Sequence, residues 1–250
     1  MRDLKNTARI LLLIISIFLL SAIQVAAAPK PKSLELNEKA VAAVKAQDYK
    51  RAEKLFKNAL AEDKGNLTAA FNLAGMYLTN QKQQQAITLL KQYTDANPKD
   101  AGLWARLGDA YFSNKDLNNA QISYEKSLTL DATSVETTKR LATVYTLKNN
   151  TKKSEVLLRK AHSLNPKDAQ TAANLSSTLL VNENPKEAVT FAKRAIQLSP
   201  SKEVYITLGT AYEVLNDYKN ALIAFERAQD LGEKSSDLRK KIQGLKKAVS

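Results

Sequence analysis

The chain has 250 residues, no cysteine and a formal net charge of +13. The absence of cysteine excludes disulfides, thiolate metal sites, a cysteine nucleophile and an acylated lipoprotein cysteine. A chain of this length can bury a core large enough to be stable without disulfides.

Residues 1–28 have the organisation of a secretory signal peptide: a basic start, an apolar middle and an alanine-rich end. We expect cleavage between Ala27 and Ala28, which would leave a mature charge of +11 because three basic residues and one acid are lost. The alternative is an uncleaved anchor, since residues 10–28 would span about 28 Å as a helix, close to the hydrocarbon thickness of a bilayer. Either way we expect an exported protein, in a bacterial periplasm, with residues 10–28 as the candidate inner-membrane anchor.

A repeat of 34 residues fills the chain from residue 33 to residue 235, after a short linker at 29–32. One small residue recurs at Ala40, Ala74, Gly108, Ala142, Ser176 and Gly209, and a second recurs at Ala52, Ala86, Ala120, Ser154, Ala188 and Ala221. Large apolar residues flank both positions at helical spacing. Each repeat is therefore predicted to be a pair of helices that pack most closely at the two small residues.

Capping residues mark where the helices are expected to begin. Before the second helix of each repeat stand Asp48, Asp116, Asn150, Asn184 and Asp217, and before the first helix stand Asn66, Asp100, Ser134, Asp168 and Ser201. Their side-chain oxygens can accept hydrogen bonds from the free N–H groups of a helix start. Lys82 is the one residue that breaks the first of these two series.

The repeat resembles the tetratricopeptide repeat family. The third repeat carries the signature most clearly, with Trp104, Leu107, Gly108, Tyr111, Ala120 and Tyr124. The resemblance covers six repeats, at residues 33–66, 67–100, 101–134, 135–168, 169–201 and 202–235. It implies an all-α, right-handed superhelical solenoid of six helical hairpins, whose concave wall is formed by the first helices and holds a peptide or a partner helix. The first repeat departs from the pattern, as terminal repeats often do.

Residues 236–250 are predicted to form a C-terminal capping helix. One stripe of this segment is apolar and covers the last repeat, with Leu238, Ile242, Leu245 and Val249. The opposite side is basic, which suits the polar outer face that a solenoid cap requires. Contact of this basic side with an anionic membrane surface is the alternative.

We find no catalytic constellation, and predict no enzymatic activity, no metal site and no cofactor. The only histidine, His162, is expected at the surface without partners for acid–base or metal chemistry. Nucleic acid is not an expected partner, because the basic residues are not interleaved with aromatics and the chain is expected to be exported.

The resemblance places the sixth residue of each first helix in the concave wall: Glu38, Asn72, Arg106, Arg140, Asn174 and Thr207. From these and a neighbouring lysine we select a candidate peptide-binding site of Asn72, Arg106, Lys139, Arg140 and Asn174. Amide and guanidinium donors one repeat apart suit an extended peptide with acidic segments. The alternative is that these are solvated polar positions. A clamp for chaperone tails is not expected, because Asn37, Val41 and Gly102 stand where that clamp has other residues.

The sequence thus predicts a non-catalytic, exported scaffold or adaptor that binds a protein or peptide and serves the assembly of an envelope complex. One alternative is a membrane-tethered chaperone or protease adaptor that presents bound clients to an enzyme on another chain. A third is a binder of anionic polymers or lipids, using the net positive charge.

Overall fold

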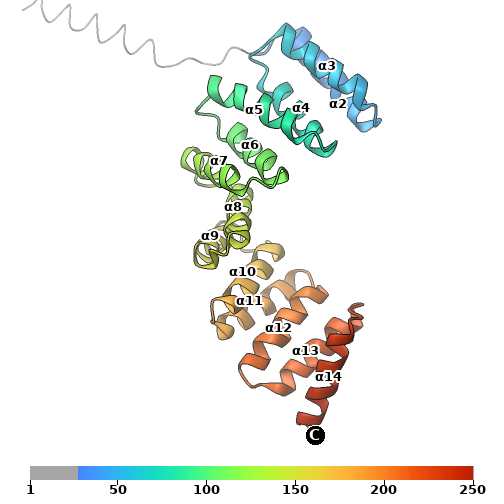
Figure 1. Cartoon of the computed structure of the whole chain (residues 1–250), viewed down its shortest axis with the longest axis vertical. Coiled ribbons are helices and arrows are strands. Elements are labelled where there is room, and N and C mark those ends of the chain that lie inside the picture. Colours follow the sequence, from blue (N-terminus) through green and yellow to red (C-terminus); the bar gives the residue numbers. More distant parts are fainter. Residues whose placement is uncertain (1–27, 250) are drawn as a thin grey trace, which may run out of the picture. The chain divides into compact units, whose positions relative to one another are not determined.

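The computed structural model describes residues 28–249, which form helices joined by short turns with no strand in that range (Figure 1). The helices are α2 (Pro31–Lys45), α3 (Tyr49–Glu62), α4 (Leu67–Thr79), α5 (Gln83–Ala96), α6 (Ala101–Ser113), α7 (Leu117–Leu130), α8 (Val135–Leu147), α9 (Thr151–Leu164), α10 (Ala169–Val181), α11 (Pro185–Leu198), α12 (Lys202–Val214), α13 (Tyr218–Asp230) and α14 (Ser236–Val249). The prediction of an all-α helical repeat fold is confirmed. The predicted signal peptide lies outside the described residues, except for Ala28.

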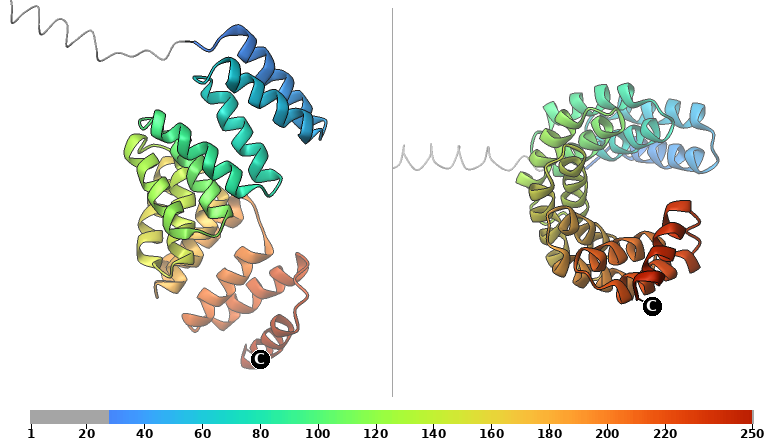
Figure 2. Two further views of the ribbon diagram at one scale, coloured as in Figure 1. Left: turned by 45° about the horizontal axis from the view of Figure 1, so that its top comes forward. Right: turned by 60° about the horizontal axis from the view of Figure 1, so that its bottom comes forward.

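The helices fall into two compact units, divided between Met76 and Tyr77 inside α4. In the second unit, the two helices of each hairpin pack together, and each second helix also contacts the first helix of the next hairpin. Two further views follow this succession from α6 to α14 (Figure 2). Within residues 28–249, none of the helices combines the length and the apolar character that crossing a membrane requires.

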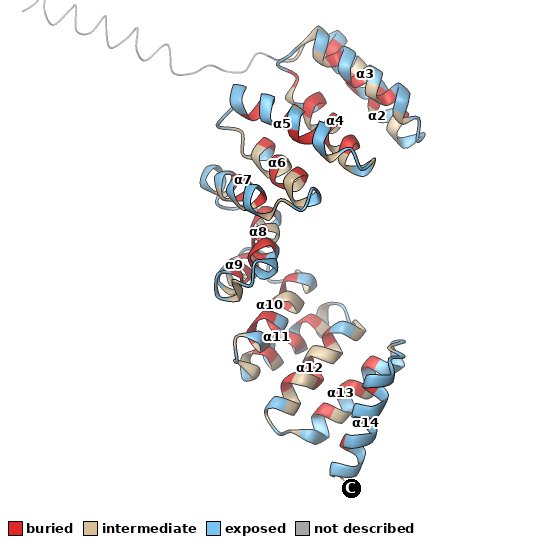
Figure 3. Ribbon diagram, viewed as in Figure 1, coloured by how far each residue is buried: buried red, intermediate tan, exposed pale blue. Residues whose placement is uncertain are grey.

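Small residues allow the two helices of a hairpin to approach closely. A Cβ atom added at Gly108 in α6 would lie 2.5 Å from the ring of Tyr124 in α7, and one added at Gly209 would lie 2.6 Å from the ring of Phe225. Both rings are almost fully buried. The prediction that Gly108 and Gly209 lie where the two helices touch is therefore confirmed, and each faces the aromatic ring four residues after the second small position rather than that small residue itself. Buried residues gather where paired helices face each other (Figure 3).

The turn inside each hairpin has a conformation that the sequence did not reveal. One residue per turn has a left-handed backbone with φ between 57° and 62°, and none of them is glycine: Gln47, Gln81, Lys115, Asn149, Glu183 and Asn216. Such residues end the first helix, because the following N–H groups can reach back to its last carbonyls. The N–H of Asp116, for example, donates to the carbonyl of Tyr111 at 2.9 Å.

Asp116, whose N–H closes the first helix, also caps the start of the second helix. The Asp116 carboxylate accepts a hydrogen bond from the N–H of Asn119 at 3.1 Å, so one residue closes the first helix and caps the second. Asp48, Asn150, Asn184 and Asp217 make the equivalent caps, and Lys82 makes none. At the starts of the first helices, a side-chain oxygen likewise accepts a hydrogen bond from an N–H two or three residues later, at Asn66, Asp100, Ser134, Asp168 and Ser201. Both predicted series of capping residues are confirmed, including the interruption at Lys82.

In the first unit, α2 begins at Pro31, two residues before the expected start of the first repeat, because proline fits the first turn of a helix. Ser33 on this helix donates to the carbonyl of Ala59 at 2.7 Å and accepts from the amide of Asn66 at 2.8 Å. These buried bonds tie the start of α2 to the end of α3 and the start of α4.

The last helix, α14, covers the sixth hairpin. Leu238, Ile242 and Leu245 are buried against Phe225 and its alanine neighbours in α13. On the basic side, Lys246 forms an ion pair with Glu226 at 2.9 Å, and Lys241 pairs with Glu213. Two of the lysines therefore fasten the helix to the preceding hairpin.

Candidate functional site

Two of the predicted site residues, Arg106 in α6 and Arg140 in α8, converge on one carboxylate. The Arg140 guanidinium donates to Asp109, which lies one turn after Arg106 in α6. The Arg106 Nη1 atom lies 3.8 Å from the other Asp109 oxygen. The hydroxyl of Tyr124 in α7 donates to Asp109 at 2.8 Å, so three helices meet at this side chain.

The environment of this cluster keeps its cations and its phenol in their usual protonation states. Burial lowers the pKa of Arg106, and its neighbour Asp109 opposes this change. Burial also acts to lower the pKa of Arg140, but the hydrogen bond from Arg140 to Asp109 and the charge of that carboxylate outweigh it and raise the pKa. Burial and the charge of Asp109 raise the pKa of Tyr124 well above its ordinary value. Both arginines are therefore charged, and Tyr124 remains a hydrogen-bond donor.

These contacts change the role that the sequence suggested for the two arginines. We expected both side chains to be outside the packing and available to a ligand. The structure instead places Arg106 and Arg140 in the contact between the third and fourth hairpins, where Asp109 is only 13% exposed and needs a cation beside it. A cavity of about 250 Å³ opens beside the cluster, lined by Arg106, Asp109, Phe112, Ser113, Tyr124 and Arg140.

Arg140 has a second, more accessible partner. Its Nε atom donates to Glu136, one turn earlier in α8, at 3.0 Å. The Glu136 side chain is 63% exposed and that of Arg140 is 38% exposed. An exposed ion pair of this kind contributes little to stability. A carboxylate from another molecule can therefore replace Glu136 on Arg140 while Asp109 stays in place.

Lys139, which we expected to add charge beside Arg140, forms a different contact. Its Nζ lies 2.7 Å from Asp168, the capping residue of α10, and 3.7 Å from Glu136. The hydrogen bond to Asp168 raises the pKa of Lys139. Lys139 thus links the fourth hairpin to the fifth, and its charge is largely used within the chain.

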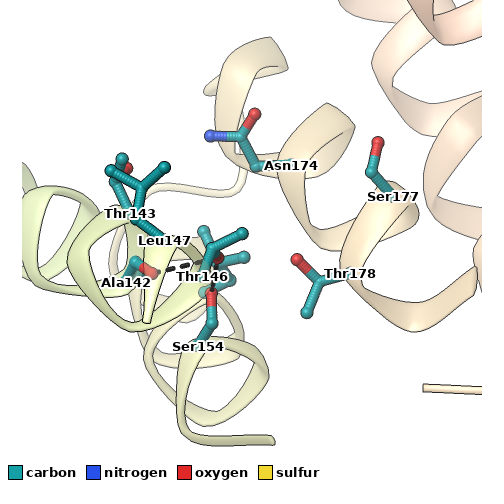
Figure 4. A pocket seen from close by; sticks show the side chains of 9 residues that line it. Ala142, Thr143, Thr146, Leu147, Ser154, Asn174, Ser177 and Thr178 are labelled. Carbon is teal, nitrogen blue, oxygen red and sulfur yellow. Dashed lines mark hydrogen bonds between the residues drawn. The ribbon is translucent and has the colours of Figure 1, made fainter. Parts of the chain in front are cut away.

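Asn174 borders a neutral cavity between the fourth and fifth hairpins (Figure 4). The cavity has a volume of about 210 Å³ and is lined by Ala142, Thr143, Thr146, Leu147, Ser154, Leu158, Asn174, Ser177 and Thr178. Thr146 donates to the carbonyl of Ala142 at 3.1 Å and shares a hydrogen bond with Ser154 at 2.8 Å. No charged side chain lines this cavity, so it suits a small uncharged group.

Asn72 belongs to the first unit, where its amide donates to the side-chain oxygen of Asn37 at 3.1 Å. It therefore joins α2 to α4. Of the predicted site residues, the structure brings Arg106 and Arg140 together. The cavity that Asn174 borders begins at Thr143, one turn after Arg140 along α8.

Sequence reasoning missed several features of this surface. The central role of Asp109 in the arginine cluster was not predicted, because its position gave no periodic signal. The ends of the first helices carry exposed aliphatic residues at Leu147, Val181 and Val214, and their spacing of about one repeat could have revealed them.

The expectation that His162 lies at the surface is corrected, because its side chain is half-buried and its ring packs perpendicular to that of Phe191, with 5.3 Å between the ring centroids. No group of three or more His, Cys, Asp or Glu side chains in residues 28–249 is placed to hold a metal ion.

Comparison with known proteins identifies the repeat. A family model described as tetratricopeptide repeat matches residues 43–110, and a second model of that description matches residues 101–134 and 203–233. The heat-shock protein cognate co-chaperone sgt12 of Aspergillus fumigatus is 30% identical over 123 residues, which cover 46% of this chain and 36% of that protein. This chain therefore matches about a third of the length of that relative.

Solved structures share the fold. The crystal structure of YrrB, described as a TPR protein with an unusual peptide-binding site, has a TM-score of 0.65 and 18% identity, and the match covers 71% of this chain and 92% of YrrB. The Pseudomonas aeruginosa pilF structure has a TM-score of 0.71 and 14% identity, covering 87% of this chain and 97% of pilF. At these identities the likeness concerns the fold alone.

Proposed function

Because the chain belongs to the tetratricopeptide repeat family, we propose that it is a non-catalytic scaffold that binds an extended segment of a partner protein along α8 and α10. The observation that carries this proposal is the position of two different subsites one helical turn apart. Arg140 offers a partly exposed guanidinium, and Thr143 begins the neutral cavity beside Asn174.

The two subsites define a ligand chemistry. A carboxylate of the partner replaces Glu136 on Arg140, where a charge-assisted hydrogen bond fixes its position. A small aliphatic or hydroxyl side chain next to it fills the cavity of about 210 Å³, and the Asn174 amide bonds the peptide backbone. The partner segment is therefore acidic at one residue and small and uncharged at a neighbouring residue.

Peptide arrays test this chemistry on the full chain. We expect peptides with an aspartate or glutamate near a valine, threonine or leucine to bind better than the same peptides with asparagine or glutamine. Arg140→Gln should weaken binding by about 2 kcal/mol or more, because it removes the charged partner of the ligand. Glu136→Gln is the matched variant, and should bind the same peptides at least as tightly as the wild type because a competing carboxylate is gone. Equal binding of the acidic and amide peptides, or no effect of Arg140→Gln, would exclude this site.

We further propose that the scaffold is exported and serves a bacterial envelope complex. Residues 1–28 support this proposal by their sequence, with a basic start, an apolar run and an alanine-rich end. Sequencing the N-terminus of protein isolated from its source should find Ala28 as the first residue. An intact Arg2 would instead support an uncleaved anchor at residues 10–28.

A second candidate is a chaperone or protease adaptor that presents bound clients to an enzyme on another chain. It is favoured by the co-chaperone among the relatives, which shares 30% identity over 123 residues. This function predicts binding of unfolded model clients with little dependence on Arg140, whereas the scaffold function predicts one specific acidic segment.

A further inference from the structure

The second helices of the last three hairpins share a pattern that the peptide site does not use. In each, a cation lies near the helix start, an uncharged β-branched residue follows one turn later, and a second cation follows one turn after that. The pattern is Lys152, Val156 and Lys160 in α9, and Lys219, Ile223 and Arg227 in α13. In α11 it is Lys186, Thr190 and Arg194. Because side chains four residues apart share one face of a helix, each helix carries the three groups side by side. We call these nine residues the lysine–aliphatic stripe.

The stripe is open to solvent. Val156 is 68% exposed and Ile223 is 56% exposed, although both are large aliphatic residues. Helix α7 continues the pattern in part, since Ile122 is 59% exposed and Lys126 follows it by one turn. Exposed aliphatic side chains therefore occupy this position in three of the four helices α7, α9, α11 and α13, and such recurrence indicates an interaction surface rather than scattered exposed residues.

The cations of the stripe are poorly matched by acids. Arg227 lies 3.4 Å from Asp230, and Lys160 interacts electrostatically with Asp131. The lysines at the helix starts, Lys152, Lys186 and Lys219, have no ion pair within 4.0 Å in the part of the chain that the structure describes. The stripe therefore presents unneutralised positive charge along three consecutive hairpins.

Neither feature of the stripe stabilises its own helices. Lys152, Lys186 and Lys219 are each the second residue of a helix, where the positive end of the helix dipole disfavours a cation. Val156, Thr190 and Ile223 are β-branched, and their helix propensity is lower than that of the common straight-chain residues. Because residues that are unfavourable for helix stability recur at the same positions in three repeats, they indicate a function other than stabilising the helices.

We propose that the lysine–aliphatic stripe binds the surface of a bilayer that contains anionic lipids. The lysines would contact the lipid phosphates, and the valine and isoleucine would enter the boundary between head groups and acyl chains. A bilayer fits this pattern better than an acidic protein, because identical contacts repeated from helix to helix require no particular register in the partner.

This inference does not depend on the proposed peptide site. The stripe lies on α9, α11 and α13, whereas the peptide subsites lie mainly on α8 and α10. A protein segment and a membrane surface can therefore be bound by different helices of the same hairpins.

Co-sedimentation of the full chain with lipid vesicles tests the proposal. One set of vesicles contains phosphatidylcholine alone and the other also contains phosphatidylglycerol, so any binding through residues 1–28 contributes to both. The stripe variant carries Lys152→Gln, Lys186→Gln and Lys219→Gln. The control variant carries Lys99→Gln, Lys167→Gln and Lys234→Gln, which removes the same charge from exposed loops between hairpins.

We expect wild type and control to prefer the anionic vesicles to a similar extent, within about twofold. In the stripe variant, the ratio of binding to anionic over neutral vesicles should fall about fivefold for each lysine that touches the membrane, and by up to about a hundredfold in total. Val156→Asn with Ile223→Asn should also weaken binding to anionic vesicles, and these exposed changes should leave the melting temperature unaltered. Equal binding of the wild type to both kinds of vesicle, or equal losses in the stripe and control variants, would overturn the proposal. Binding to an acidic protein but not to anionic vesicles would also overturn it.

Discussion

Gly108→Ala is a sensitive test of how closely the hairpins pack. The added Cβ would lie 2.5 Å from two ring carbons of Tyr124, about 0.9 Å short of an ordinary contact at 3.4 Å. The ring cannot move away easily, because it is 1% exposed and its hydroxyl donates to Asp109. Opening the helices instead would disturb the Arg106 and Arg140 cluster.

The expected size of the effect follows from two opposing contributions. Alanine in place of glycine favours a helix by about 1 kcal/mol. Overpacking of a buried contact costs typically about 1–3 kcal/mol, and the constrained ring places this case at the upper end. The net loss should be about 2 kcal/mol, or about 4–8 °C in melting temperature for a unit of this size. Gly108→Leu should lower the melting temperature further.

Gly244→Ala supplies the matched control. Gly244 lies inside α14, and a Cβ added there would meet no atom within 4 Å apart from its chain neighbours and the backbone of its own helix. Only the helix propensity then changes, so the melting temperature should rise by up to about 2–4 °C. Thermal unfolding followed by circular dichroism measures both variants. A Gly108→Ala protein as stable as the wild type would show that the third hairpin is packed differently.

Three further predictions concern turns, pH and the cap. Glu183→Gly should stabilise the fold by about 0.5–1 kcal/mol, because the left-handed backbone at φ 61° strains a glutamate; a lower melting temperature would contradict this. Burial acts to raise the pKa of Asp168, but hydrogen bonds from Lys139 and Thr171 outweigh it and lower the pKa below its ordinary 3.8. Asp168 therefore stabilises the fold above about pH 4, and this contribution is lost as the pH falls through the folded pKa. Between about pH 5 and pH 2, the melting temperature of Asp168→Asn should therefore fall less than that of the wild type. An equal fall in melting temperature for the two proteins would exclude the linkage. Leu245→Ala should cost about 2 kcal/mol by opening the cap, measured by urea unfolding, and a neutral result would mean that α14 is dispensable.

The fold could be predicted closely because its determinants are local and repeated. Small residues, apolar stripes and caps recur at fixed spacing, so each repeat supports the interpretation of the others. The left-handed turn residues escaped prediction because four of the six are glutamine, lysine or glutamate, and only two are asparagine, which favours this conformation. Only the hydrogen bonds across the turn reveal it.

The residues of the candidate site could be selected from the sequence, but the contacts that their side chains make could not be predicted. The resemblance to the tetratricopeptide repeat indicated the sixth residues of the first helices, whereas their partners come from neighbouring repeats. Asp109 gathers arginines from two hairpins, and Lys139 reaches forward to the cap of the next hairpin. Such pairings depend on the angle between hairpins, which the spacing of residues along the chain does not contain.

Site-specific photocrosslinking in the source cell tests the central claim most directly. A photoreactive amino acid at Ser177 would stand at the neutral cavity beside Asn174, and the same group at Thr190 would stand on the lysine–aliphatic stripe. Our account predicts a discrete protein adduct from position 177 that disappears when Arg140→Gln is added, and no protein adduct from position 190. A protein adduct from position 190 with none from position 177 would contradict the assignment of the partner to the first helices.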